Sequence, residues 1–489
     1  MEITKKIPRI LIASPSSAAG KTTVTCAILA ALRRRANEGE KCSPIAFKCG
    51  PDFIDPLFHR AAGAESANLD GFFLSSEKIR ALFSQYTADI AVIEGAMGFY
   101  DGLCVDSDRA SSYDIARTLD CPVILAVDAA KSARSIAALL AGFSRWKSDS
   151  RVIGVILNNI TEERAAELKT VIENEVGLSV FGFLKKDARF SIESRYLGLS
   201  VPSENSAIAE KMAILADSAE KTIDIDAIIA AAKNAPMLSV PAEPIFPVQK
   251  NTPSVKIAVA KDEAFCFYYR ENLDLLRAFG AQIITFSPLH DKKLPDGIDA
   301  LYLGGGYPEL FPDALFENTT LCESIRGSIR GGLPVLAECG GFLYLQALGV
   351  LKGTFCNTGK LCRFGYATVR AEKDTLLCTA GEEIKAHEFH YFDTSENGTA
   401  CTAEKPSGKK WACVISEQFD ETPALPPFSQ TLNVWAGFPH LYFLSNPNFA
   451  KNFVEAAARF QKMRSVLRTK CSVCPKKHRK SIPAGDFSL

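Results

Sequence analysis

Hydrophobic residues in the first half of the chain fall into short, β-branched runs, which are bounded by turn residues and separated by segments long enough for helices. These runs lie at residues 9–13, 89–93, 122–127, 152–157 and 180–183. Strands that alternate with helices are typical of a parallel sheet covered by helices. The pattern therefore predicts an α/β domain over residues 1–233.

A second series of the same kind fills most of the back half. Residues 234–254 separate the two series, and they carry five prolines without a helical or strand period. The runs that follow lie at residues 255–260, 282–286, 300–303 and 334–337. We expect a linker over residues 234–254 and a second α/β domain, again with a mainly parallel sheet, over residues 255–467.

The last segment, residues 468–489, is basic and rich in turn residues. It contains Cys471, Cys474 and His478, a set that lacks the fourth ligand of a structural zinc site. We expect this tail to be disordered.

The composition of the chain argues against nucleic acid and membranes as binding partners. The 56 lysines and arginines balance the 56 aspartates and glutamates, so no global field draws the chain to nucleic acid or to a membrane surface. No apolar run approaches the roughly 18 to 20 residues of a spanning helix. The 15 cysteines are scattered in largely apolar contexts, which favours free thiols in a reducing compartment. We expect a cytoplasmic protein without nucleic acid or membrane partners.

A phosphate-binding loop follows the first strand. Residues 14–23 read Ser-Pro-Ser-Ser-Ala-Ala-Gly-Lys-Thr-Thr and lead into a helical pattern, although Pro15 replaces the first glycine of the strict motif. Gly20 allows a tight turn, Lys21 offers a charge to phosphate, and Thr22 offers a hydroxyl to magnesium. ATP is the implied ligand. The residues assigned to it are Ser17, Gly20, Lys21, Thr22, Thr23 and Asn158.

Asn158 ends the strand at residues 152–157. Its side chain could bind an adenine edge or could equally cap the following turn.

Acidic residues follow two further strands. Residues 48–56 read Lys-Cys-Gly-Pro-Asp-Phe-Ile-Asp-Pro, and the two prolines predict a loop around Asp52 and Asp55 that is too constrained for a helix. Glu94 ends another strand beside a glycine-rich turn, where α/β sheets bind ligands. A solvated loop acid explains any one of these residues alone, whereas their grouping predicts a magnesium site formed by Thr22, Asp52 and Glu94.

A cysteine lies at a strand-to-helix elbow in the back half. Residues 334–343 read Pro-Val-Leu-Ala-Glu-Cys-Gly-Gly-Phe-Leu, which places Cys339 at a helix N-terminus. The helix dipole should favour its thiolate, and the glycines should let a carbonyl group approach. Of the six histidines, His440 lies in a late apolar segment that must return to the sheet, and we choose it as the general base.

A glycine turn at residues 303–309, Leu-Gly-Gly-Gly-Tyr-Pro-Glu, follows another strand. The backbone N–H groups of Gly305 and Gly306, together with Gly340, are assigned to an oxyanion hole. A plain tight turn explains these glycines almost as well.

Five motifs in fixed order resemble the cobyrinic acid a,c-diamide synthase family over nearly the whole chain up to the tail. They are G-K-T-T, K-x-G-P-D-F-I-D-P, E-G-x-M-G-x-Y-D-G, G-G-G-Y-P-E and A-E-C-G-G-F. That family joins an ATP-binding domain similar to dethiobiotin synthetase to a class I glutamine amidotransferase-like domain. The resemblance implies that Cys339 releases ammonia from glutamine through a thioester, and that ammonia displaces phosphate from an acyl phosphate made with ATP and Mg2+.

The resemblance also implies a tetrapyrrole acid as substrate, two amides formed in sequence, and a ligase activity. The residues that it places around the acyl phosphate are Lys48, Asp52, Asp55, Tyr100 and Asp101. The sequence departs from the family's pattern at Ala18 and Ala19, and no acid follows His440 by two residues. The third member of a Cys-His-Glu triad is therefore absent from its usual place.

Alternatives stay open. The same amidation could act on nickel-sirohydrochlorin or on hydrogenobyrinic acid. A different class of protein, a P-loop switch with an inactive glutaminase-like domain, also fits the motifs. The order of the two amidations, the role of the tail and the oligomeric state, with a homodimer as one option, stay undecided by the sequence.

Overall fold

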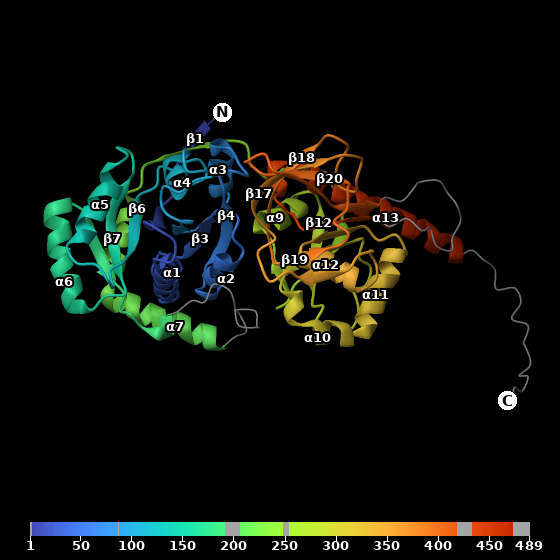
Figure 1. The fold of residues 1–489 in the computed structure, drawn as a ribbon, viewed down its shortest axis with the longest axis horizontal. Coiled ribbons are helices and arrows are strands. Elements are labelled where there is room, and N and C mark those ends of the chain that lie inside the picture. Colours follow the sequence, from blue (N-terminus) through green and yellow to red (C-terminus); the bar gives the residue numbers. More distant parts are fainter. Residues whose placement is uncertain (1, 87, 191–205, 248–253, 418–432, 473–489) are drawn as a thin grey trace, which may run out of the picture.

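The computed structural model describes residues 2–86, 88–190, 206–247, 254–417 and 433–472 as two α/β halves side by side (Figure 1). Within the described residues of the front half, seven parallel strands form one sheet in the order β4-β3-β5-β2-β6-β7-β8. The strands are β2 (Arg9–Ala13), β3 (Pro44–Cys49), β4 (Glu65–Leu69), β5 (Ile90–Glu94), β6 (Val123–Asp128), β7 (Val152–Asn158) and β8 (Ser179–Phe183). The predicted parallel sheet is confirmed.

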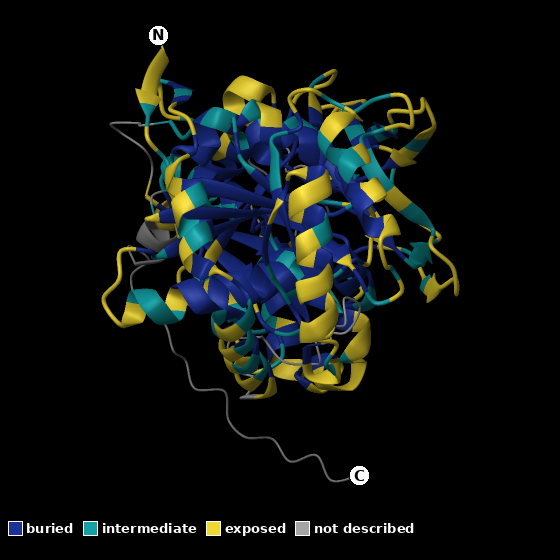
Figure 2. Ribbon diagram, turned by 90° about the vertical axis from the view of Figure 1, so that its left-hand side faces the viewer, coloured by how far each residue is buried: buried dark blue, intermediate teal, exposed yellow. Residues whose placement is uncertain are grey.

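Helices cover both faces of this sheet, which is why its strands read as continuous apolar runs. One face packs against α1 (Lys21–Asn37), α2 (Ile54–Ala61), α7 (Ser206–Thr222) and α8 (Ile225–Lys233). The other face packs against α3 (Ser76–Phe83), α4 (Ser112–Thr118), α5 (Ser135–Arg145) and α6 (Glu162–Val171). Figure 2 shows the strands buried inside this double layer and the exposed outer sides of the helices.

The back half contains two larger sheets in its described residues. The first has the order β12-β10-β13-β15-β23-β22 and is parallel except for β22. Its strands are β10 (Val255–Ala260), β12 (Ala281–Phe286), β13 (Ala300–Leu303), β15 (Val335–Glu338), β22 (Ile415–Glu417) and β23 (Val434–Gly437). Its helices are α9 (Arg270–Ala278), α10 (Pro312–Glu317), α11 (Thr319–Arg330), α12 (Gly340–Ala347) and α13 (Asn448–Ser472).

The second sheet of the back half is antiparallel and was not predicted from the sequence. Its order is β21-β20-β17-β18-β24. Its strands are β17 (Arg363–Ala371), β18 (Glu383–His390), β20 (Cys401–Glu404), β21 (Lys410–Cys413) and β24 (His440–Leu441). Three two-stranded pairings complete the described sheets: β1 (Glu2–Lys5) with β9 (Leu238–Pro241), β11 (Phe265–Phe267) with β14 (Gly305–Gly306), and β16 (Phe355–Asn357) with β19 (Phe392–Thr394).

The nine strands expected from apolar runs are all present, each with ends within one residue of the prediction. The structure differs in part from the boundaries expected for the linker and the tail. Part of the predicted linker forms β9, whose single proline, Pro241, is tolerated because β9 is an edge strand that pairs only with β1. The first residues of the predicted tail continue α13 to Ser472, and residues 473–489 lie outside the described residues.

The two halves meet along the edge of the front sheet. In Figure 1, β4 and α2 face β17 and α9. Glu271 of α9 accepts a hydrogen bond from the backbone N–H of Asn68, and the hydroxyl of Tyr366 donates to Asp70 at 2.7 Å. The contact includes a continuous hydrophobic cluster with residues from both halves. Within the described parts of the chain, no helix combines the length and apolar character that crossing a membrane requires.

We expect Asn272→Ala to destabilise the back half. Asn272 is fully buried on α9; its amide nitrogen donates to the carbonyl of Leu441 at 2.7 Å, and its amide oxygen accepts from the N–H of Phe443 at 2.8 Å. The substitution leaves two buried backbone groups unpaired, which costs about 2 kcal/mol or more. Thermal unfolding followed by circular dichroism should show a lower midpoint, whereas the exposed Asn234→Ala should unfold with the parent protein.

Candidate active site

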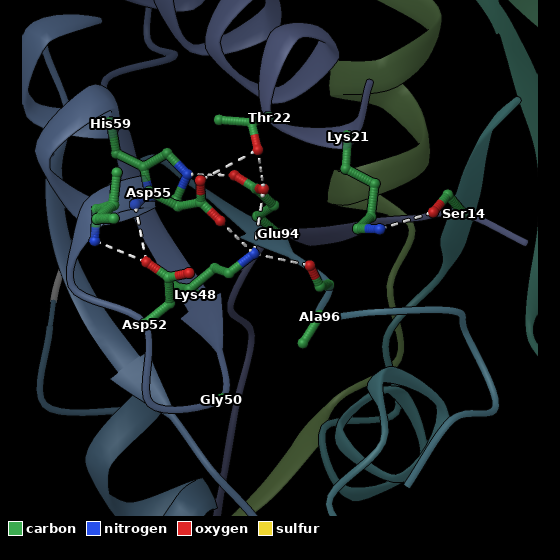
Figure 3. Close-up of polar contacts among 12 residues, drawn as sticks. Ser14, Lys21, Thr22, Lys48, Gly50, Asp52, Asp55, His59, Glu94 and Ala96 are labelled. Atoms are coloured by element: carbon green, nitrogen blue, oxygen red, sulfur yellow. Dashed lines mark hydrogen bonds and ion pairs between the residues drawn. The ribbon is translucent and has the colours of Figure 1, made fainter. Parts of the chain in front are cut away.

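The phosphate loop is closed by its own lysine. The ammonium group of Lys21 donates to the hydroxyl of Ser14 at 2.8 Å (Figure 3). It also donates to the carbonyl of Met97 at 2.6 Å. Gly20 has a φ of 87° and lies so close to Asn158 that a Cβ there would overlap the asparagine side chain. Burial and the nearby Lys48 lower the pKa of Lys21 to about 8. A bound phosphate would reverse this effect, because it would stabilise the charged ammonium.

A buried charge cluster stands beside the loop, as Figure 3 shows. Glu94 at the end of β5 is 0% exposed; its Oε1 accepts from Thr22 at 2.7 Å and from Lys48 at 3.1 Å. Its Oε2 lies 2.6 Å from Nε2 of His59. Asp55 contacts Lys48 at 2.6 Å and Thr22 at 3.2 Å. Four of the residues assigned from the sequence, Thr22, Lys48, Asp55 and Glu94, thus meet in one place.

The charged groups of the cluster shift one another's pKa values. Burial alone would lower the pKa of Lys48, but the carboxylates of Asp55 and Glu94 outweigh it and raise that pKa. Burial also opposes ionisation of Glu94, yet Lys48 and His59 overcome it and lower the pKa of Glu94. Burial and the charge of Glu94 raise the pKa of Asp55 to about 7. Of these two carboxyl groups, Glu94 is therefore the one that ionises more readily.

The loop predicted around the two acids is partly wrong. Asp55 lies in the first turn of α2, where Pro56 is tolerated because a first-turn N–H has no acceptor within the helix. Asp52 accepts from the N–H groups of Ile54 at 2.6 Å and Asp55 at 3.1 Å. Asp52 therefore caps the helix, and Asp55 instead contacts Thr22 in the described structure.

Other assigned residues lie outside the cluster. The hydroxyl of Tyr100 donates to the carbonyl of Phe143 at 2.7 Å, and Asp101 accepts from the N–H of Gly98 at 2.9 Å. Ser17 is exposed in the loop, and Thr23 is half-buried on α1. The amide nitrogen of Asn158 donates to the carbonyl of Ala19 at 3.1 Å, so this side chain supports the phosphate loop.

His59 belongs to the cluster, although the sequence analysis gave it no role. It is fully buried, and its ring nitrogens contact Glu94 and the hydroxyl of Ser66 at 3.0 Å. The spacing of four residues from Asp55 on α2 places both side chains on one helix face. This signal could have been found only if residues 54–61 had been predicted as a helix.

The second centre surrounds Cys339 at the elbow between β15 and α12. Cys339 has a φ of 49°, a backbone conformation that is unusual for a residue with a side chain, and it is 9% exposed. A Cβ placed on Gly305 would lie 3.2 Å from Nε2 of His440 and 3.4 Å from Cβ of Cys339. A Cβ on Gly340 would lie 3.5 Å from the backbone nitrogen of Gly306. The cysteine, the histidine and the three glycines assigned from the sequence lie together.

The expectation of a helix-stabilised thiolate at Cys339 is not met. Burial raises the pKa of this thiol above its usual value, and the charge of Glu309 acts in the same direction. The backbone N–H of Gly340 opposes this shift without cancelling it. The resting cysteine is therefore a thiol, and attack on a carbonyl requires a base that takes its proton.

Glu338 is the second residue that the sequence analysis did not assign. It is 2% exposed, and its Oε2 lies 3.8 Å from Nδ1 of His440. Its position directly before Cys339, at the end of a buried strand, is the sequence feature that could have identified Glu338.

One short segment connects the two centres. The ring of Phe53 lies 4.9 Å from the ring of His440 and 4.4 Å from that of Tyr269, measured between centroids. The hydroxyl of Tyr269 donates to the carbonyl of Pro51 at 3.1 Å. Because Phe53 lies two residues before Asp55, residues 50–55 touch the histidine of one centre and belong to the charge cluster of the other.

Comparisons with known proteins agree with this two-part arrangement. Residues 10–197 match the CobQ/CobB/MinD/ParA nucleotide binding domain family, and residues 256–448 match the CobB/CobQ-like glutamine amidotransferase domain family. A cobyrinate a,c-diamide synthase of Picrophilus torridus is 37% identical over 92% of this chain and 99% of its own length. Relatives with the same name from Dehalococcoides mccartyi and Listeria monocytogenes are 36% and 39% identical over 93% and 90% of this chain, and over 99% and 97% of their own lengths.

We expect His59→Asn to weaken binding of magnesium ATP about tenfold, because second-layer partners of metal-binding carboxylates commonly contribute that much. Asparagine can reach Ser66 but not Glu94. The matched variant His59→Gln can reach Glu94 and should bind closer to the parent value. Isothermal titration with magnesium ATP measures both, and equal binding by all three proteins would contradict the role of His59.

Proposed function

The chain belongs to the cobyrinate a,c-diamide synthase family, and from this premise we propose that it converts the a and c carboxylates of cobyrinic acid into carboxamides in cobalamin biosynthesis. The chain is a glutamine-dependent amidoligase, and ATP is its co-substrate. The observation that carries the proposal is the contact of residues 50–55 with both centres. A cytoplasmic location, where both co-substrates are available, is part of the proposal.

In the back half, the proposed reaction is release of ammonia from glutamine. His440 takes the proton of the Cys339 thiol as sulfur attacks the amide carbon of glutamine. Backbone N–H groups at Gly305, Gly306 and Gly340 stabilise the oxyanion. The proton then passes to the departing ammonia, and water hydrolyses the resulting thioester to glutamate, which regenerates the thiol. The burial of Cys339 supports this order of events, because it raises the pKa of the thiol and so favours proton transfer to a base during the attack.

In the front half, the proposed reaction is activation of a carboxylate by ATP. The carboxylate oxygen attacks the γ-phosphorus, ADP leaves, and an acyl phosphate forms. Lys21 binds phosphate, and Lys48 lies where it can offset the charge of the transferred group. The hydroxyl of Thr22 and the carboxylates of Asp55 and Glu94 are the hard oxygen donors that Mg2+ prefers. When bound, the ion would neutralise charge on the phosphates.

The final step joins the two reactions. Ammonia attacks the acyl phosphate, the carbon–nitrogen bond forms and inorganic phosphate leaves. Free ammonia would be protonated and diluted in water, so a protected path between the centres is needed. The packing of Phe53 between His440 and the start of α2 supports residues 50–55 as one wall of this path.

The most specific part of the proposal is the identity of the tetrapyrrole substrate. Cobyrinic acid, nickel-sirohydrochlorin and hydrogenobyrinic acid each carry carboxylates that this chemistry could amidate. Incubation of the protein with each compound, ATP and glutamine, followed by mass spectrometry, tests the choice. Two successive losses of about one mass unit per amide, with cobyrinic acid only, would support the proposed substrate. Amidation of another compound instead would overturn it.

Cys339→Ala should abolish glutamine-dependent synthesis and preserve synthesis from ammonium, because only the nitrogen source is lost. The exposed Cys104→Ala is the matched control and should behave as the parent protein. Product formation with each nitrogen donor is measured. Equal loss of both activities in Cys339→Ala would defeat the two-centre proposal.

Lys21→Ala should remove synthesis with either nitrogen donor by at least about 100-fold, because carboxylate activation requires the nucleotide phosphates. The exposed Lys131→Ala should retain both activities. Product formation from ammonium and ATP is the decisive assay. Activity of Lys21→Ala with ammonium at the parent rate would mean that the phosphate loop is misassigned.

A further inference from the structure

We propose that Glu338 is the positioning residue of His440 and supplies, from the strand before the nucleophile, the carboxylate that is absent two residues after the histidine. The inference rests on the proposed function of Cys339 and His440 in glutamine hydrolysis. It assigns the role to Glu338 because of three features: the unpaired ring nitrogen of the histidine, the fixed position of the carboxylate, and the direction from which it approaches.

The first feature is the state of the histidine ring. His440 is 2% exposed, and its Nε2 lies on the side of Gly305, where a Cβ would stand 3.2 Å from Nε2 and 3.4 Å from Cβ of Cys339. Among the residues that the structure describes, the buried Nδ1 has no hydrogen-bond partner. A buried N–H without a partner costs about 1 to 3 kcal/mol. The nearest carboxylate oxygen in an ion pair with this ring is Oε2 of Glu338, at 3.8 Å from Nδ1.

The second feature is how firmly the carboxylate is held. Its Oε2 accepts a hydrogen bond from the hydroxyl of Tyr302 at 2.9 Å, and its Oε1 accepts from the backbone N–H of Leu441 at 3.0 Å. Tyr302 is fully buried on the neighbouring strand β13. Leu441 directly follows His440 in β24, so the carboxylate and the imidazole are tied to the same two-residue strand. Side-chain freedom at Glu338 is therefore small.

The third feature is the surroundings of the histidine. The neighbouring acid Glu388 lies 3.2 Å from His390 and accepts from Trp411 at 3.2 Å, so it serves a different ring. His387 lies opposite His440 in the pairing of β18 with β24, and as a histidine it offers no carboxylate to the ring. The ring of Phe53 covers His440 from the front half. Glu338 is thus the acid that the described structure places against Nδ1.

This placement explains how the base can work. His440 accepts the thiol proton at Nε2 only in the tautomer that carries hydrogen on Nδ1. A carboxylate beside Nδ1 favours that tautomer and stabilises the imidazolium that forms after transfer. A shift of less than 1 Å would bring Nδ1 and Oε2 from 3.8 Å into hydrogen-bond range, and such contacts often tighten when substrate binds. Glu338 acts through His440 and is therefore a positioning residue.

The test is Glu338→Gln, which keeps the shape and removes the charge. We expect the kcat of glutamine hydrolysis to fall at least about 100-fold, the KM for glutamine to stay within about threefold, and ammonium-dependent synthesis to stay at the parent rate. Asp299→Asn is the matched control, because it makes the same change at a fully buried acid that pairs with Arg464 instead. Its kcat for glutamine hydrolysis should not change.

An unchanged kcat in Glu338→Gln overturns the inference, and so does a higher KM with kcat retained, which would place the carboxylate in glutamine binding. Loss of ammonium-dependent synthesis as well would mean misfolding, and Tyr302→Phe then decides. Tyr302→Phe removes the hydroxyl that donates to Glu338 and should lower the kcat of glutamine hydrolysis about threefold to tenfold at unchanged KM. An unchanged kcat in this variant overturns the inference. Glutamine hydrolysis by Cys339→Ala would instead refute the proposed function.

Discussion

The contact of Phe53 with His440 links the two centres of the molecule. Phe53 stands at the start of α2, whose first turn contributes Asp55 to the charge cluster, and its ring packs against the histidine of the second centre. Phe267 and Tyr269 also contact this ring, at centroid distances of 5.2 Å and 4.4 Å. Residues 53–55 therefore link the charge cluster of the front half to the histidine of the second centre.

The charge cluster illustrates why such a site is built from several partners. Removing a carboxylate such as Glu94 from water is costly, and the cost is offset only when its oxygens are fully hydrogen-bonded to charged and polar groups. Thr22, Lys48 and His59 provide these bonds from three different elements. The cluster therefore ties the phosphate loop, β3 and α2 to the end of β5. The loss of any partner should disturb positions as well as charge.

At the second centre, burial favours the neutral form of the functional group, whereas the charge cluster keeps a buried carboxylate ionised. Apolar surroundings keep the Cys339 thiol protonated, so nucleophilic attack depends on the position of a base. Three chain segments approach this one point: the elbow after β15, the glycine turn at β14, and β24 with His440. Glu338 of β15 and Asn272 of α9 hydrogen-bond to the backbone of Leu441 and Phe443 and so hold the segment that carries His440.

The parallel α/β character of both halves, the phosphate loop and the cysteine elbow could be predicted from the sequence. Local signals suffice there, because apolar runs, turn residues and motif spacing are properties of neighbouring residues. The placement of Asp55 on a helix, the contact of His59 with Glu94 and the approach of Glu338 to His440 could be seen only in the packed fold. These contacts join residues far apart in the chain or depend on the direction in which a side chain leaves its strand. The balance of burial and charge that sets protonation at Cys339 and Asp55 likewise exists only in the packed molecule.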